Sequence, residues 1–307
     1  MRNPVQINGI PTSKKKPMST FTLRRSGTGM ILAVFLMLSC KEEERLTISD
    51  TQEITEESVT DAYYLDIDDM ATVAVSTPSD DQYSGGRVAT TVTITDLRFC
   101  AGTKVTITPG ANSTFSEPNG TMTVDFGAGC TDLHGNTRAG KLIFTYNKWR
   151  FTPGSTIVAT TDNYVVNGIK LEGKRTLTNV NLSAEETSPK FHALLEDGKA
   201  TFLDGSTAVR ESDITWQWTR TDSPADDFLT ILATSNANGT TRKGAEYEVD
   251  VYEALIYKRN CGIAVSGIKK YFLDTKEITI DYGSGDCDRS VVVTVNGTSR
   301  SFTISEN

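Results

Sequence analysis

Short Thr- and Val-rich runs, separated by two-residue turn signals, dominate the chain from about Arg87 onward. The turn signals are Asn119-Gly120, Asn167-Gly168, Asp197-Gly198, Asp204-Gly205, Asn238-Gly239 and Asn296-Gly297. Such pairs favour tight hairpins, because a type I′ turn needs positive φ at both central residues. No helical pattern alternates with the runs, which argues against a parallel βαβ sheet. The sequence therefore predicts a mainly antiparallel β protein, either a β-sandwich or an extended β-meander.

One amphipathic helix is expected ahead of the strands. Between residues 57 and 75, apolar side chains recur at three- and four-residue steps, which is the period of a helix face. The stripe consists of Val59, Tyr63, Ile67, Met70 and Ala74. Ser58 or Thr60 is suited to cap the start, and Pro78 would stop the helix. We place this N-terminal helix at residues 58–78.

The chain contains one long apolar run, Met30–Ser39, which is followed directly by Cys40. The run is too short to span a bilayer, which needs about 20 apolar residues. It fits the apolar region of a secretory signal, with Arg24 and Arg25 as the positive region before it. Positive charge, apolar run, small residue and cysteine, in that order, are typical of a bacterial lipoprotein signal. Cys40 is therefore the predicted lipid attachment residue.

These features divide the chain into segments. We expect a lipoprotein signal peptide at 1–39, in which 1–17 is an extension before an alternative start at Met18. A flexible acidic tether at 40–57 and the helix at 58–78 follow. The all-β body at 79–307 is either undivided or built of two related halves, 79–185 and 186–307. The tether is expected because its sequence, polar and acidic, shows no apolar period.

The net charge of the chain limits the classes of binding partner. Removing residues 1–39 takes away six of the 31 basic residues and none of the 39 acidic ones, which leaves 25 against 39 and a net charge of −14. Such a surface disfavours nucleic acid, whose phosphates need Lys and Arg to neutralise them. No basic helix is available to bind anionic lipid. Contact with the membrane is therefore expected through the lipid on Cys40.

Lipidation of Cys40 leaves four cysteines, Cys100, Cys130, Cys261 and Cys287. Four cysteines can pair in three ways, and an exported protein meets an oxidising compartment. A zinc site is the alternative, but zinc ligands usually come in close Cys-x-x-Cys pairs, whereas these residues are 30 and 26 positions apart. We expect disulfides and no metal.

A faint duplication bears on the pairing. The segment 124–132 (VDFGAGCTD) resembles 280–288 (IDYGSGDCD), and each follows a strand-like run that ends in a cysteine. The parallel favours pairing within each copy, Cys100 with Cys130 and Cys261 with Cys287. Carboxylates near glycines could also hold calcium, and the candidates are Asp125, Asp132, Asp281, Asp286 and Asp288. Neither turn has the spacing of a calcium loop, so a tight turn is the preferred interpretation.

Candidate functional residues are few. Trp216 and Trp218 alternate on a predicted strand, so both indoles share one face. That face is either a platform for sugar rings or part of the core, and Ile214 on the same face favours the core. The two histidines, His134 and His192, belong to no catalytic motif. The remaining carboxylates are interpreted as a solvated surface: Asp66, Asp68, Asp69, Asp80, Asp81, Asp226 and Asp227. We predict no catalytic residue, no cofactor and no enzymatic activity.

Three segments, 125–146, 162–180 and 265–297, resemble uncharacterised surface lipoproteins of Bacteroidota-type Gram-negative bacteria. The resemblance implies an exported, lipid-anchored all-β protein. It also implies that the acidic tract Lys41–Glu44 directs the protein to the cell surface. The lipobox departs from the usual pattern at Met37, where Leu is common. The family supplies no catalytic residues.

The expected function is that of an outer-membrane lipoprotein, anchored at the cell surface, with a binding or scaffolding role toward a protein or glycan. The first alternative is an extracellular glycan-binding protein or polysaccharide hydrolase that uses the Trp216 and Trp218 face. The second is a subunit of a larger outer-membrane assembly, for which an open sheet edge or an exposed apolar patch would be the sign.

Overall fold

The computed structural model describes residues 48–75, 89–92, 98–183, 185–223, 226–258 and 261–304. These residues form one helix and sixteen strands. The elements are α1 (Ile48–Val75), β1 (Thr90–Val92), β2 (Lys104–Pro109), β3 (Gly120–Asp125), β4 (Cys130–Thr131), β5 (Thr137–Tyr146), β6 (Thr156–Val166), β7 (Ile169–Asn179), β8 (Lys190–Thr201), β9 (Thr207–Thr219), β10 (Phe228–Ile231), β11 (Asn236–Thr240), β12 (Glu246–Lys258), β13 (Ser266–Leu273), β14 (Lys276–Ser284), β15 (Ser290–Val295) and β16 (Thr298–Thr303).

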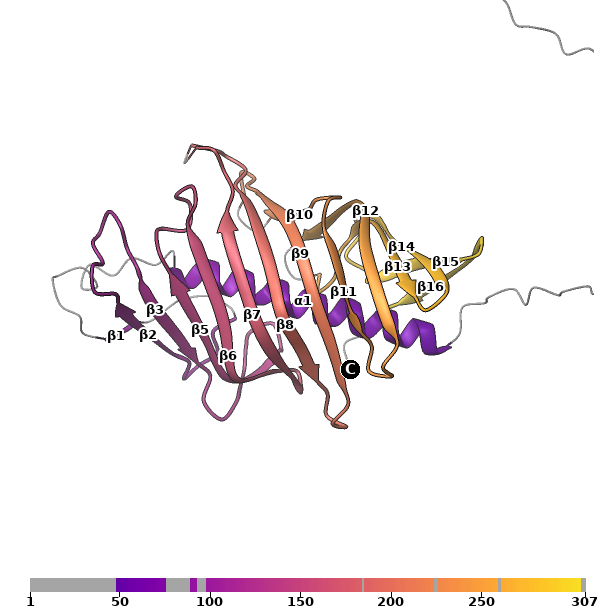
Figure 1. Ribbon diagram of the computed structural model, residues 1–307, viewed down its shortest axis with the longest axis horizontal. Coiled ribbons are helices and arrows are strands. Elements are labelled where there is room, and N and C mark those ends of the chain that lie inside the picture. The colour runs from indigo at the N-terminus through magenta and orange to yellow at the C-terminus, as the bar shows by residue number, and fades with distance from the viewer. Residues whose placement is uncertain are drawn as a thin grey trace, which may run out of the picture. The chain divides into compact units, whose positions relative to one another are not determined.

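All strands belong to one antiparallel sheet, which confirms the predicted mainly β class with a single helix. The strand order follows the chain from β1 to β16, with two local exceptions. The short strand β4 pairs only with β5, and β10 and β11 share the place between β9 and β12. Figure 1 shows α1 crossing the strands. The sheet is unbroken between β7 and β8, where Asn179 pairs with Phe191, so the boundary considered at residue 185 falls inside one sheet.

The helix begins earlier than the pattern of apolar residues predicts. It begins at Ile48, so residues 48–57, which were expected to lie in a flexible tether, are helical instead. The capping roles expected of Ser58 and Thr60 are therefore wrong, because both lie inside the helix. The predicted stripe is confirmed at Val59, Tyr63, Ile67 and Met70, all of which are buried. The side chain of Ala74 and residues 76–78 fall outside the described part of the chain.

Two of the predicted hairpins are confirmed in detail. Asn167 and Gly168 join β6 to β7 with φ values of 47° and 79°, and Asn296 and Gly297 join β15 to β16 with 49° and 78°. These are the positive φ angles that a type I′ turn requires. Asp204-Gly205 also lies in a turn, between β8 and β9.

The other three turn predictions are wrong. Asn119-Gly120 leads into β3, Asp197-Gly198 lies within β8, and Asn238-Gly239 lies within β11. Gly239 has a steric role: a Cβ atom there would lie 1.9 Å from the carbonyl oxygen of Val209 on β9. A glycine inside a strand permits such close approach of two backbones. The dipeptide alone does not distinguish this use from a hairpin.

The duplicated segments adopt similar local structures. The Asp125 carboxylate accepts a hydrogen bond from the Gly127 amide at 2.8 Å, and Asp281 accepts one from Gly283 at 2.8 Å. Both glycines have positive φ, 64° and 83°. The two turns are thus closed by the same carboxylate-to-backbone bond, as expected for tight turns.

Candidate functional site

An acidic row follows one face of α1. Glu53, Glu57, Asp61 and Asp68 stand four, four and seven residues apart, which places them in line along a helix. All four are buried, with at most 7% of each residue exposed. A buried charge is costly unless it is paired and hydrogen-bonded, so the row needs cations from the sheet.

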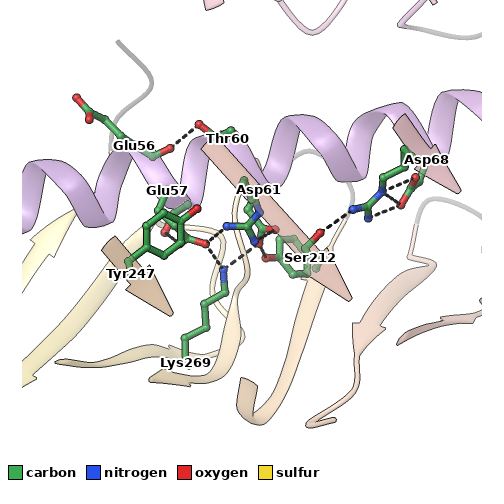
Figure 2. A network of polar contacts seen from close by, with 12 residues as sticks. Glu56, Glu57, Thr60, Asp61, Asp68, Ser212, Tyr247 and Lys269 are labelled. Atoms are coloured by element: carbon green, nitrogen blue, oxygen red, sulfur yellow. Dashed lines mark hydrogen bonds and ion pairs between the residues drawn. The ribbon is translucent and has the colours of Figure 1, made fainter. Parts of the chain in front are cut away.

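The sheet supplies these cations, and Figure 2 shows the polar contacts around the central part of the helix. Arg210 on β9 binds two carboxylates, with Nη1 2.7 Å from Glu57 and Nη2 2.7 Å from Asp61. Lys269 on β13 lies 2.8 Å from Asp61 and 3.5 Å from Glu57. These four side chains form a closed network of two anions and two cations, each at most 5% exposed.

Electrostatics inside this network favour the charged forms. Burial alone would raise the pKa of Asp61, but Lys269 and Arg210 outweigh burial and hold that pKa below its ordinary value of 3.8. The Tyr257 hydroxyl also donates a hydrogen bond to Asp61, at 3.2 Å. Burial raises the pKa of Tyr257 well above its ordinary value, so this tyrosine stays a neutral donor. The network therefore anchors the helix as a set of fixed charges.

A second pair lies further along the helix. Arg175 on β7 holds Asp68 with Nε 2.9 Å and 3.1 Å from the two carboxylate oxygens and Nη2 2.7 Å from Oδ2. Its Nη1 donates to the Ser212 hydroxyl at 3.1 Å. This forked geometry is the strong form of an Arg–carboxylate pair.

Arg138 on β5 forms a third ion-pair centre. It lies 2.7 Å from Asp66 and 2.9 Å from Asp132, and it donates to the Tyr164 hydroxyl at 2.6 Å. Next to it, Asp69 pairs with Arg98. The helix is therefore held by charge along most of its length.

The prediction that the remaining carboxylates lie on a solvated surface is wrong for three of them. Asp68 and Asp227 are buried, and the Asp66 side chain is only 24% exposed. Asp69 keeps 53% of its side chain exposed, and Asp226 is exposed as expected. Asp80 and Asp81 lie outside the described residues.

A cavity of about 790 Å³ lies beside α1 and the sheet. The helix contributes Ala62 and Leu65, and β9 contributes Trp216 and Trp218. Leu133, which is 80% exposed, also lines it. The volume falls in the range of small-molecule sites, roughly 300–1,000 Å³. This cavity is the candidate binding site.

Arg150 is the most unusual residue of the cavity wall. The residue is 2% exposed, and its guanidinium carbon lies 4.7–5.7 Å from the ring centres of Phe151, Phe191, Trp216 and Trp218. Burial lowers the pKa of Arg150 to about 9. The group is nevertheless cationic near neutral pH, and it is stabilised by the electron-rich ring faces.

The two tryptophans predicted to share a face do so. Trp216 is buried and stacks on Phe191 with ring centres 4.6 Å apart. Trp218 is half-buried, and its indole N–H donates to Asp227 at 3.1 Å. Trp216 is thus a core residue that also lines the cavity, and Trp218 continues the same wall. Their role toward a ligand stays a prediction.

The cysteines pair as the duplication predicted. Cys100 and Cys130 are bonded with Cα atoms 6.0 Å apart, and Cys261 and Cys287 with Cα atoms 5.2 Å apart. The second disulfide lines the cavity. Cys40, the predicted lipid attachment residue, lies outside the described residues.

The remaining polar candidates have structural contacts. Asp132 accepts hydrogen bonds from the backbone amides of His134 and Asn136, both at 2.9 Å. His192 pairs with Asp213 at 2.7 Å in an exposed position between β8 and β9. Within the described ranges, no three His, Cys, Asp or Glu side chains gather as a metal site.

Comparison with known proteins found no matching family model, no matching curated protein and no matching solved structure. No helix in the described part of the chain is long and apolar enough to cross a membrane. Function is therefore inferred from the geometry of the cavity and from the N-terminal sequence.

Neither the buried cations nor Arg150 was predicted from the sequence. A signal for the cations exists in the strand register: Arg210 alternates with Ser212, Ile214 and Trp216, so it points to the same inward face. A charged residue at an inward position predicts a buried partner. Arg150 has no such signal, because it lies in a turn after β5.

Proposed function

We propose that the protein is a cell-envelope lipoprotein, anchored through lipid on Cys40, that binds a small molecule in the cavity beside α1 rather than catalysing a reaction. The observation that carries the binding role is the cavity itself, with a volume of about 790 Å³ and two tryptophans in its wall. The anchor is supported by the sequence around Cys40, and surface exposure by the tract Lys41–Glu44. The sequential strand order favours an extended meander over a sandwich for the body.

The anchor is tested by metabolic labelling with a palmitate analogue. The wild-type chain should take up label and fractionate with outer membranes, and the Cys40→Ala variant should do neither. Two acyl chains suffice for stable anchoring, since each buried CH₂ contributes about 0.8 kcal/mol. Label on the variant would refute lipidation at this residue.

The binding role is tested by native mass spectrometry of the protein released from membranes. An Ala62→Phe variant places a ring in the cavity and should lose any co-purified small molecule that the wild type carries. Ala62→Ser is the matched control and should keep it. Equal occupancy in a folded Ala62→Phe variant would exclude this cavity.

The alternative is a glycan-binding protein or polysaccharide hydrolase. It is supported by two carboxylates, Asp66 and Asp227, that line the same cavity as the tryptophans. Burial raises the pKa of Asp66, which suits a general acid, although Arg138 and Arg98 oppose the shift. Hydrolysis of a polysaccharide panel that is abolished by Asp66→Asn would establish this alternative; no hydrolysis by the wild type would leave the binding role preferred.

A further inference from the structure

The cavity wall carries more positive than negative charge. Its basic residues are Arg98, Arg138, Arg150, Lys258 and Arg289, and its acidic residues are Asp66, Asp69 and Asp227. The wall thus contains five basic and three acidic residues, whereas the whole chain has a formal net charge of −8.

The three carboxylates are already engaged by other groups. Asp69 pairs with Arg98, and Asp66 lies 2.7 Å from Arg138. Asp227 accepts hydrogen bonds from the Trp218 indole and from the Thr221 backbone amide, at 3.1 Å and 2.7 Å. None of the three is within ion-pair distance of Arg150.

Arg150 is left with unused donors. Its Nε and Nη1 atoms are buried, and neither has a hydrogen-bond partner among the residues that the structure describes. The indole N–H of Trp216, whose ring lies 5.7 Å from the Arg150 guanidinium carbon, is likewise buried without a hydrogen-bond partner in the described parts. Buried polar groups in folded proteins nearly always find partners, so such atoms need an explanation.

The wall also has a large apolar part. Leu65 on α1, Val166 on β6 and Phe228 and Leu229 on β10 line the cavity together with the two tryptophans. A ligand that fills this volume therefore needs an apolar body. A ligand that satisfies Arg150 needs an anionic group, because a guanidinium donates to carboxylate or phosphate in a fork.

We propose that the cavity takes an organic anion, a carboxylate or phosphate on an apolar body, with its anionic group as the counterion of Arg150. This inference rests on the binding role proposed above and specifies the class of ligand. The aromatic rings hold the guanidinium in place before the ligand arrives, which reduces the ordering needed on binding. The Trp216 N–H is a second buried donor without a partner in the described parts, on a ring that packs against the same guanidinium.

The test uses the lipidated full chain in nanodiscs and isothermal titration calorimetry, with empty nanodiscs as the blank. The probes are naphthoate, naphthyl phosphate and the uncharged naphthalenemethanol, which share one apolar body. The wild type should bind at least one anion about ten- to one-hundred-fold more tightly than the alcohol, the range for a hydrogen bond to a charged group. The two anions distinguish a carboxylate site from a phosphate site.

Arg150→Met should weaken binding of the preferred anion by the same factor and leave the alcohol unchanged. Arg220→Met is the matched control, because Arg220 stacks on the rings of Phe151 and Trp218 but does not line the cavity. If Arg150 has only a structural role, Arg150→Met should change the unfolding midpoint and leave the preference for the anion over the alcohol intact.

The outcomes separate the inference from the proposed function. Equal affinity of the wild type for the alcohol and both anions would overturn the anion site and leave a binding cavity. Binding of no probe would overturn the inference together with the cavity as a site for ligands of this size. The wild-type comparison needs no variant, so it decides the question even where Arg150→Met does not fold.

Discussion

The pair between Asp68 and Arg175 allows a quantitative test of how the helix is held. The two side chains are 2% and 3% exposed, and three N–O distances of 2.7–3.1 Å join them. Because water cannot replace either partner, Asp68→Leu should leave a buried guanidinium and cost about 3–5 kcal/mol of unfolding free energy. Arg175→Met should cost about the same, since it leaves a buried carboxylate.

The double variant is the informative one. Replacing a buried ion pair with apolar residues of similar size is often close to neutral, so the double variant should cost less than either single variant. The coupling energy should therefore reach at least about 3 kcal/mol, the full cost of one single variant. Urea unfolding followed by tryptophan fluorescence, with far-UV circular dichroism as a second probe, measures all four proteins.

An exposed pair on the same sheet is the control. Lys174 and Glu196 lie 2.7 Å apart, but their side chains are 51% and 42% exposed. Glu196→Gln should change the unfolding free energy by less than about 1 kcal/mol. If Asp68→Leu costs no more than this control, or if the two buried substitutions simply add, the helix is not held by its ion pairs and the reasoning is wrong.

Three further predictions concern stability. First, the folded pKa of Asp61 is depressed, so this carboxylate stabilises the protein above about pH 4 and its contribution declines as the pH falls through the folded pKa. In urea titrations, the difference in unfolding free energy between wild type and Asp61→Asn should therefore shrink below about pH 4, and a constant difference would contradict the shift. Second, Cys261→Ser with Cys287→Ser opens a loop with a sequence separation of 26 and should remove roughly 3–4 kcal/mol; a loss near zero in the same assay would show that the denatured chain was not constrained by the bond. Third, Gly239→Ala should lower the unfolding free energy by about 1–3 kcal/mol through overpacking, whereas Asn238→Ala, at the exposed neighbouring position, should change it by no more than about 0.5 kcal/mol. Equal effects of the two variants on the urea midpoint would argue against the close backbone approach.

Local features of this fold were predictable from sequence because their causes are local. The Asn167-Gly168 and Asn296-Gly297 hairpins follow from the φ angles that these residues tolerate. The disulfide pairing followed from a repeated turn. The errors at Gly198 and Gly239 share one cause: each glycine accommodates a backbone from a neighbouring strand, which the dipeptide alone does not reveal.

The extent of the helix was missed for a non-local reason. Glu53 and Glu57 look solvated in isolation, because the cations that neutralise them are far away in the sequence: Lys243 in the turn between β11 and β12, and Arg210 on β9. The cavity is non-local too, since α1, β9 and the turn after β5 each supply part of its wall. Only the inward register of residues such as Arg210 and Lys269 hinted at buried charge.

The ion pairs between α1 and the sheet also affect how the chain folds. The helix precedes its partners in the sequence, by 107 residues from Asp68 to Arg175, and by 149 and 208 residues from Asp61 to Arg210 and Lys269. Contacts at such separations slow folding, because a long loop must close before they form. Asp61 acquires its second cation only with β13, so the buried network between α1 and the sheet is complete only when nearly the whole polypeptide takes part.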